Sequence, residues 1–124
     1  MIRSKIAGPI HSQYRFAIAP GVEVHPGRFY SFDTSGLLVK PEDSAAGRRA
    51  VFAQERATGN ATGTRKALCA VSVIALIPKG TLTAADRGRM TYVTAELAAS
   101  TTDNGKPCGL LLDVDETTAA IKIG

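Results

Sequence analysis

The chain has 124 residues, with 15 lysines and arginines against 11 aspartates and glutamates, which gives a formal net charge of +4. This length supports one domain with a modest core, and it is too short for the two lobes of many cofactor-dependent enzymes. Hydrophobic residues make up 44% of the chain and aromatic residues 6%, with no tryptophan, so the composition excludes intrinsic disorder and favours thin sheets over a bulky aromatic core.

Residues 1–26 predict an extended N-terminal arm, because three prolines and the glycines beside them prevent a continuous helix. Within the arm, Tyr14, Phe16 and Ile18 alternate with Gln13, Arg15 and Ala17, which is the period of a strand. Such a segment is typical of a strand that joins a sheet, either of its own chain or of a partner. The first ten residues lack the apolar segment of a secretory signal, so we expect synthesis in the cytosol.

Residues 27–124 predict a single β-rich domain whose short strands are separated by turn residues. Its first part is expected to contain, in chain order, a hairpin of strands 28–32 and 37–40 around a turn at 33–36, a polar loop at 41–47, a strand at 50–56 and a flexible loop at 57–63.

The strongest strand signal follows at residues 67–77, which are apolar on both faces and are expected to form a central strand buried from both sides. Thr83 and Asp86 have the spacing of a capping box and predict one helical turn. Strands are expected at 90–94, 108–114 and 119–123. The sequence therefore predicts an all-β fold, a small barrel or sandwich with one short helical turn.

The chain offers no constellation that predicts an enzyme, a cofactor or a metal. Only two histidines occur, His11 and His25, both in the predicted arm. The acidic residues around 113–116 are expected to form a charged turn, since they lack the glycine and the distal glutamate of a calcium loop. Cys69 and Cys108 have no CxxC spacing and are expected to be buried thiols, with a disulfide as the alternative if their two strands are neighbours.

Basic residues concentrate in the first half, where residues 1–66 hold ten basic and five acidic side chains. The densest part, residues 48–66, includes Arg48, Arg49 and Arg56. Such a segment suits either the phosphates of a nucleic acid or an acidic protein surface. One alternative is therefore a small β-barrel that binds single-stranded nucleic acid through residues 48–66.

The order of elements in the second half resembles the small capsid decoration, or cement, proteins of tailed phages. The segments that carry this resemblance are residues 67–71, 77–80, 89–93, 105–112 and 120–124. With the upstream hairpin it covers residues 22–124. The resemblance implies a β-rich protein that binds the outer face of the assembled head, often as a trimer, and it implies no catalytic residues.

The hypothesis from the sequence is thus a structural virion protein, made in the host cytoplasm, that binds the major capsid protein and forms a homo-oligomer, with neither a membrane nor a nucleic acid as its expected partner. The residues expected to contact the capsid or a neighbouring copy are Tyr14, Arg15, Phe16, Ile18, Arg48, Arg49 and Arg56.

Overall fold

The structure is a computed structural model that describes residues 5–6 and 12–124. Its strands are β1 (Lys5–Ile6), β2 (Ser12–Ala17), β3 (Glu23–Val24), β4 (Phe29–Phe32), β5 (Leu38–Val39), β6 (Val51–Ala53), β7 (Ala57–Thr58), β8 (Lys66–Pro78), β9 (Met90–Ala95), β10 (Ala98–Ser100), β11 (Pro107–Val114) and β12 (Thr118–Ile123). Two short 3-10 turns, η1 (Pro41–Asp43) and η2 (Ala84–Asp86), complete the list of elements.

The prediction of an all-β fold is confirmed. One sheet runs in the order β10-β9-β11-β12-β8-β6-β4-β5, with β1 and β2 also paired to β8, and a second sheet joins β3 and β7. Every strand pair is antiparallel. The sequence predicts either a barrel or a sandwich. The large sheet is not closed, so the barrel is not observed.

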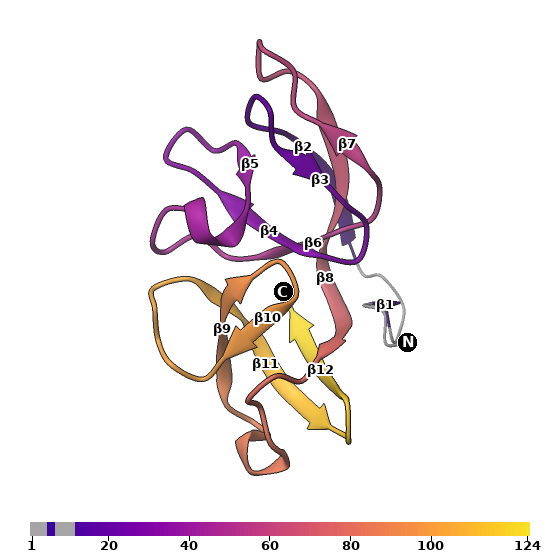
Figure 1. Cartoon of the computed structure of the whole chain (residues 1–124), viewed down its shortest axis with the longest axis vertical. Helices are drawn as coiled ribbons and strands as arrows, with labels where there is room; N and C mark the ends of the chain where they lie inside the picture. Colours follow the sequence, from indigo (N-terminus) through magenta and orange to yellow (C-terminus); the bar gives the residue numbers. More distant parts are fainter. Residues whose placement is uncertain (1–4, 7–11) are drawn as a thin grey trace.

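The 13-residue strand β8 connects two halves of the molecule (Figure 1). Its first part pairs with β2 and β6, and its last part pairs with β12. The β2 register skips Val71, since Ser12 pairs with Ser72 and Gln13 with Ala70. An extra residue of this kind bends a strand and changes its twist, which allows one strand to serve both halves.

Two hydrophobic clusters fill the two halves. The N-terminal core contains Ile18, Val24, Tyr30, Leu38, Val51, Ala53, Ala57, Ala67 and Cys69. The C-terminal core contains Phe29, Ala50, Phe52, Ala70, Val73, Ala75, Ile77, Leu82, Val93, Ala99, Cys108, Leu111, Ala119, Ile121 and Ile123. The expectation that β8 is buried on both faces is wrong in its last part, where Ile74 and Leu76 stay half-buried between fully buried neighbours.

Strand alternation divides the middle of the molecule between these cores. On β4, Phe29 enters the C-terminal core and Tyr30 the N-terminal core. On β6, Phe52 enters the C-terminal core and Val51 the N-terminal core. The two strands pair as Phe29 with Phe52 and Tyr30 with Val51. Because successive side chains of a strand point to opposite faces, β4 and β6 form a wall shared by the two cores.

Most of the predicted N-terminal arm is part of this fold. Strand β2 confirms the alternation around Tyr14 and pairs with β8 of the same chain. Strand β3 pairs with β7, and Ile18 and Val24 are fully buried. The structure therefore places the described part of residues 12–26 within the body of the protein, whereas residues 1–4 and 7–11 of the predicted arm, including His11, lie outside the described residues.

The hairpin prediction for residues 28–40 is confirmed, since β4 pairs with β5 around a turn held by Asp33, whose Oδ1 accepts from the backbone N–H groups of Ser35 and Leu37. The predicted helical turn is present as η2, with both hydrogen bonds of its capping box. A second turn, η1, occupies the expected polar loop, where Pro41 supplies the starting backbone angle.

The expectation of a flexible loop at 57–63 is wrong at its start. Ala57 and Thr58 form β7, and Ala57 is buried in the N-terminal core. Beyond β7, the Asn60 Oδ1 accepts from the N–H groups of Thr64 and Arg65 at 2.9 and 3.1 Å. An asparagine that holds backbone groups in this way fixes a turn, so the segment has a defined conformation.

Cys69 and Cys108 are both free and buried, as predicted. Burial raises the pKa of each thiol to about 12. The thiolate is the reactive form of cysteine, so both side chains act as small apolar groups, one in each core.

Candidate functional site

Three of the predicted contact residues lie on β2. Tyr14 is 64% exposed, and its ring lies 5.1 Å from that of Phe16, measured between centroids. Phe16 in turn makes an edge contact with Phe32 of β4 at 5.0 Å. These three side chains, here called the aromatic row, run from the N-terminal core, against which Phe16 and Phe32 pack, to the solvent at Tyr14.

Arg15 lies between the two aromatic residues in sequence and is held by an ion pair. Its guanidinium Nη1 contacts the Glu55 Oε1, and the same carboxylate oxygen accepts from the Leu68 backbone N–H at 2.8 Å. Glu55 follows β6 and Leu68 belongs to β8. Arg15 therefore ties β2 to the sheet, although its side chain remains more than half exposed.

Ile18 cannot be a surface contact as predicted, because its side chain is 0% exposed. It forms an isolated parallel bridge with Leu38 and donates its backbone N–H to the Arg65 carbonyl at 2.8 Å. Alternation places the Ile18 side chain on the same side of the chain as that of Phe16. At Ile18 this side points into the N-terminal core.

The three predicted arginines outside the arm are exposed but are not gathered at the aromatic row. Arg48 and Arg49 lie in the segment before β6, where the Arg49 carbonyl accepts from the Ser31 hydroxyl at 3.2 Å. Arg56 lies between β6 and β7. Within the described residues, none of these three side chains makes an ion pair. Arg56 directly follows Glu55, the residue that pairs with Arg15.

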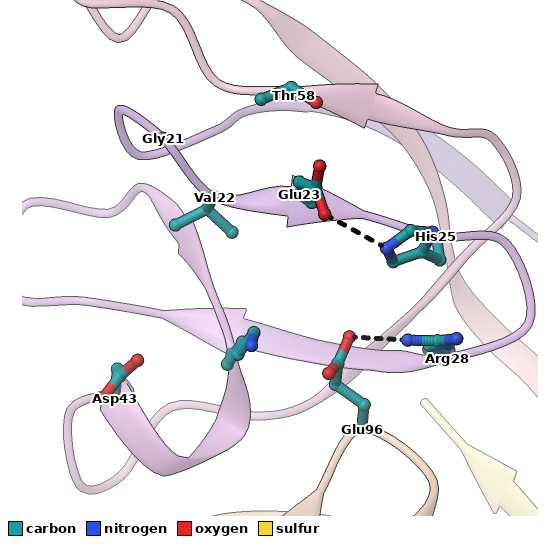
Figure 2. A pocket seen from close by; sticks show the side chains of 9 residues that line it. Gly21, Val22, Glu23, His25, Arg28, Asp43, Thr58 and Glu96 are labelled. Carbon is teal, nitrogen blue, oxygen red and sulfur yellow. Dashed lines mark ion pairs between the residues drawn. The ribbon is translucent and has the colours of Figure 1, made fainter.

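Sequence reasoning missed a cavity of about 550 Å³ on the N-terminal half. Its lining is polar and carries both signs of charge, as Figure 2 shows. The lining residues are Gly21, Val22, Glu23, His25, Arg28, Lys40, Asp43, Thr58 and Glu96. They come from separate segments that only the fold brings together, so no spacing in the sequence could have indicated the cavity.

Glu96 is the part of this cavity that comes from the C-terminal half, where it lies in the turn between β9 and β10. Its Oε2 accepts from the Tyr30 hydroxyl at 2.6 Å and lies 3.5 Å from the Arg28 Nη1. Its backbone carbonyl accepts from the Phe29 N–H at 2.7 Å. Glu96 thus binds β4 through both backbone and side chain, and it links the two halves.

Tyr30 completes the network from the buried side. Its hydroxyl accepts from the His25 backbone N–H at 2.9 Å while it donates to Glu96. Burial, followed by the hydrogen bond to Glu96, raises the pKa of Tyr30 well above its ordinary value. The hydroxyl therefore stays protonated and remains a donor to the carboxylate.

Of the remaining ionisable groups of the cavity, Glu23 and His25 lie close to each other, whereas Lys40 and Asp43 make no ion pair among the described residues. The His25 Nε2 lies 3.7 Å from the Glu23 Oε2. Among residues 5–6 and 12–124, no group of three or more His, Cys, Asp or Glu side chains could hold a metal ion. The contacts of Tyr30 and Arg28 with Glu96 link β4 and the segment before it to the β9–β10 turn.

The acidic residues near 113–116 form the charged turn that the sequence predicts. Asp113 pairs with Arg87 at 2.7 Å, and that hydrogen bond lowers the pKa of Asp113. Asp115 accepts through its Oδ1 from the N–H groups of Thr117 and Thr118, which lower its pKa. Asp115 thus holds the turn between β11 and β12, whereas Asp113 ties β11 to Arg87 at the end of η2.

No family model, curated protein or solved structure matches this chain. Across the described residues, no helix has the length and apolar character needed to span a membrane.

Replacing Glu96 with alanine is expected to lower the free energy of unfolding by about 2 kcal/mol, because a hydrogen bond to a charged group is lost and the buried Tyr30 hydroxyl loses its best acceptor. Only the Glu23 carbonyl, at 3.4 Å, remains near that hydroxyl. Urea denaturation followed by circular dichroism measures the change. Glu116→Ala, in the exposed β11–β12 turn, is the control and should change stability by less than about 0.5 kcal/mol; equal effects of the two variants would contradict the role given to Glu96.

Proposed function

We propose that this protein is a structural capsid decoration, or cement, protein that binds the outer surface of an assembled phage head and contacts the major capsid protein. The observation that carries the proposal is the aromatic row, which ends in the 64% exposed ring of Tyr14 on a strand paired only to β8 in the described part of the chain. Exposed aromatic side chains next to an unpaired strand edge are typical of protein-binding surfaces. The all-β fold agrees with what the sequence resemblance implies.

The aromatic row is suited to this role because it is anchored at one end and free at the other. Phe16 and Phe32 pack against the N-terminal core, so the position of Tyr14 is fixed before any partner arrives. Binding then orders few side chains, which limits the entropy lost on association. Arg15 stiffens the same strand through Glu55. Oligomerisation on the head, with a trimer favoured, remains part of the proposal.

Point substitutions test this better than removal of the arm, because β2 and Ile18 belong to the fold. In co-sedimentation with expanded empty heads assembled from the corresponding major capsid protein, Tyr14→Ser is expected to reduce the affinity at least about 10-fold, or ~1.4 kcal/mol. Tyr14→Phe keeps the ring and should bind as the unmodified chain does. Undiminished binding of Tyr14→Ser would refute the role of the aromatic row.

The alternative, a single-stranded nucleic-acid binder that uses residues 48–66, is separated by a second measurement. The exposed Arg48, Arg49 and Arg56 would then neutralise phosphates, and binding would weaken steeply as the salt concentration rises. We expect no gel retardation of a single-stranded oligonucleotide by micromolar protein at low salt. A salt-dependent shift, together with a failure to bind heads, would favour the alternative.

A further inference from the structure

A second apolar surface lies on the C-terminal half, on the outward side of strands β9, β11, β12 and β8. Register places Met90 opposite Leu110, Leu110 opposite Lys122, and Lys122 opposite Ile74. One row of side chains therefore crosses four strands. The row of Asp113, Ala120 and Leu76 extends the same side, and the exposed Leu112 is the extra residue of a β-bulge between Leu111 and Asp113. This surface, the C-terminal face, consists of Met90, Leu110, Leu112, Asp113, Ala120, Lys122, Ile74 and Leu76.

The C-terminal face is exposed although most of it is apolar. Met90, Leu110 and Leu112 are 41%, 39% and 37% exposed. The inward residues of the same strands, such as Leu111 and Ile121, are 0% exposed in the C-terminal core. An antiparallel sheet that faces water on one side ordinarily carries polar residues there, so a contiguous outward apolar surface marks an interaction site.

One unpaired positive charge lies within this face. Lys122 is exposed and makes no ion pair with any residue that the structure describes. Residues 1–11 contain no aspartate or glutamate, so they offer no side-chain carboxylate for it. The nearby Asp113 is already paired with Arg87. The face therefore combines apolar side chains with a cation that is free to pair with a carboxylate of a partner.

Charge argues against a symmetric contact with a second copy of the chain as the occupant, and the area of the face is too small to hold any partner alone. Four strands about 4.8 Å apart and five residues long give a face of about 19 by 17 Å. Two such faces together provide far less than the roughly 1,200–2,000 Å² that stable interfaces bury. A symmetric stack of two copies would also bring two Lys122 side chains into one apolar contact, and like charges in a desolvated contact repel.

We propose that the C-terminal face docks onto an apolar protein surface bearing a carboxylate that pairs with Lys122. This inference rests on the proposed function, under which that surface belongs to a capsid subunit. The protein then holds the head through two separate contacts, the aromatic row in the N-terminal half and the C-terminal face in the other. Two moderate contacts in one rigid molecule bind far more tightly than either alone, which offsets the small area of each.

The test uses the full chain and expanded empty heads in co-sedimentation. Leu110→Ser combined with Leu112→Ser is expected to reduce the affinity at least about 10-fold, because apolar burial is lost. Lys122→Glu should reduce it to a similar degree because it reverses the charge, and Lys122→Arg should preserve it because it keeps the charge positive. Lys66→Glu, which changes an exposed lysine at the start of β8 in the other half, is the control for the change in net charge and should bind normally. Thermal denaturation of each variant confirms that it is folded.

The outcomes separate the two proposals. If the unmodified chain binds heads and the Leu110→Ser, Leu112→Ser variant binds equally well, the C-terminal face is not a contact, and the proposed function stands on the aromatic row alone. If the unmodified chain does not bind heads, the proposed function fails and the docking partner fails with it. Sedimentation velocity supplies the remaining arm: self-association abolished by the Leu110→Ser, Leu112→Ser variant would identify a second copy as the occupant and overturn the inference.

Discussion

Replacing Phe52 with alanine is expected to destabilise the protein by about 3–5 kcal/mol, because a fully buried aromatic side chain is lost and the cavity it leaves cannot collapse completely. Phe52 is 1% exposed and makes an edge contact with Phe29 at 5.4 Å. It pairs with Phe29 of β4 on one side and with Ala70 of β8 on the other. The cavity would therefore open in the wall where the two halves meet.

The same change lowers the midpoint of thermal unfolding by about 10–20 °C for a chain of this size. Phe32→Ala is the matched control. Phe32 is a phenylalanine of β4, the strand that pairs with β6, but it belongs to the aromatic row and is only partly buried. It should cost about 1–2 kcal/mol. Equal losses of stability in the two variants would show that the shared wall does not hold the halves together.

The strand pattern of this protein could be predicted wherever a local signal decides it. The turn at Asp33, the capping box of Thr83 with Asp86 and the apolar run that became β8 all depend on residues close in sequence. Local hydrogen bonds and strand alternation favour these elements without help from the rest of the chain. Residues 57–63 lack such a clear signal, and their order comes from β3 and from the turn held by Asn60.

Burial was harder to predict than strand position. The run 67–77 is apolar on both sides, which indicated a strand covered on both faces. In the structure Ile74 and Leu76 are only half-buried, because the chain provides no second layer over the outward side of β12 and the last part of β8 in the described residues. An apolar outward face is ambiguous in sequence: it predicts either a second layer of the same chain or a partner, and only the fold distinguishes them.

The candidate sites show the same division between local and distant information. Tyr14 and Phe16 could be singled out because they are neighbours on one strand, whereas Ile18 has the same spacing and turned out to be core. The Glu96 network joins β4 to a turn more than sixty residues later, and the C-terminal face depends on the registers of four strands. Neither could be obtained from spacing along the chain.

Close packing of β11 against β12 leads to the second large effect. Replacing Gly109 with alanine is expected to destabilise the protein by about 3 kcal/mol and to lower the unfolding midpoint by roughly 10 °C. A Cβ on Gly109 would overlap the Lys122 carbonyl oxygen of β12 and lie 3.1 Å from the Ile121 Cγ2. The obstructing atom belongs to the backbone of a paired strand, so it cannot move aside without shifting β12.

Gly88→Ala is the control. The φ of 85° at Gly88 strains an alanine, but an added Cβ would lie in open space, so this change should cost only about 1–2 kcal/mol. Because Leu110 and Lys122 adjoin this contact, Gly109→Ala should also weaken head binding in co-sedimentation, whereas Gly88→Ala should not; equal stability of the two variants would show that the spacing of β11 and β12 adapts freely and would contradict the packing described for the C-terminal half.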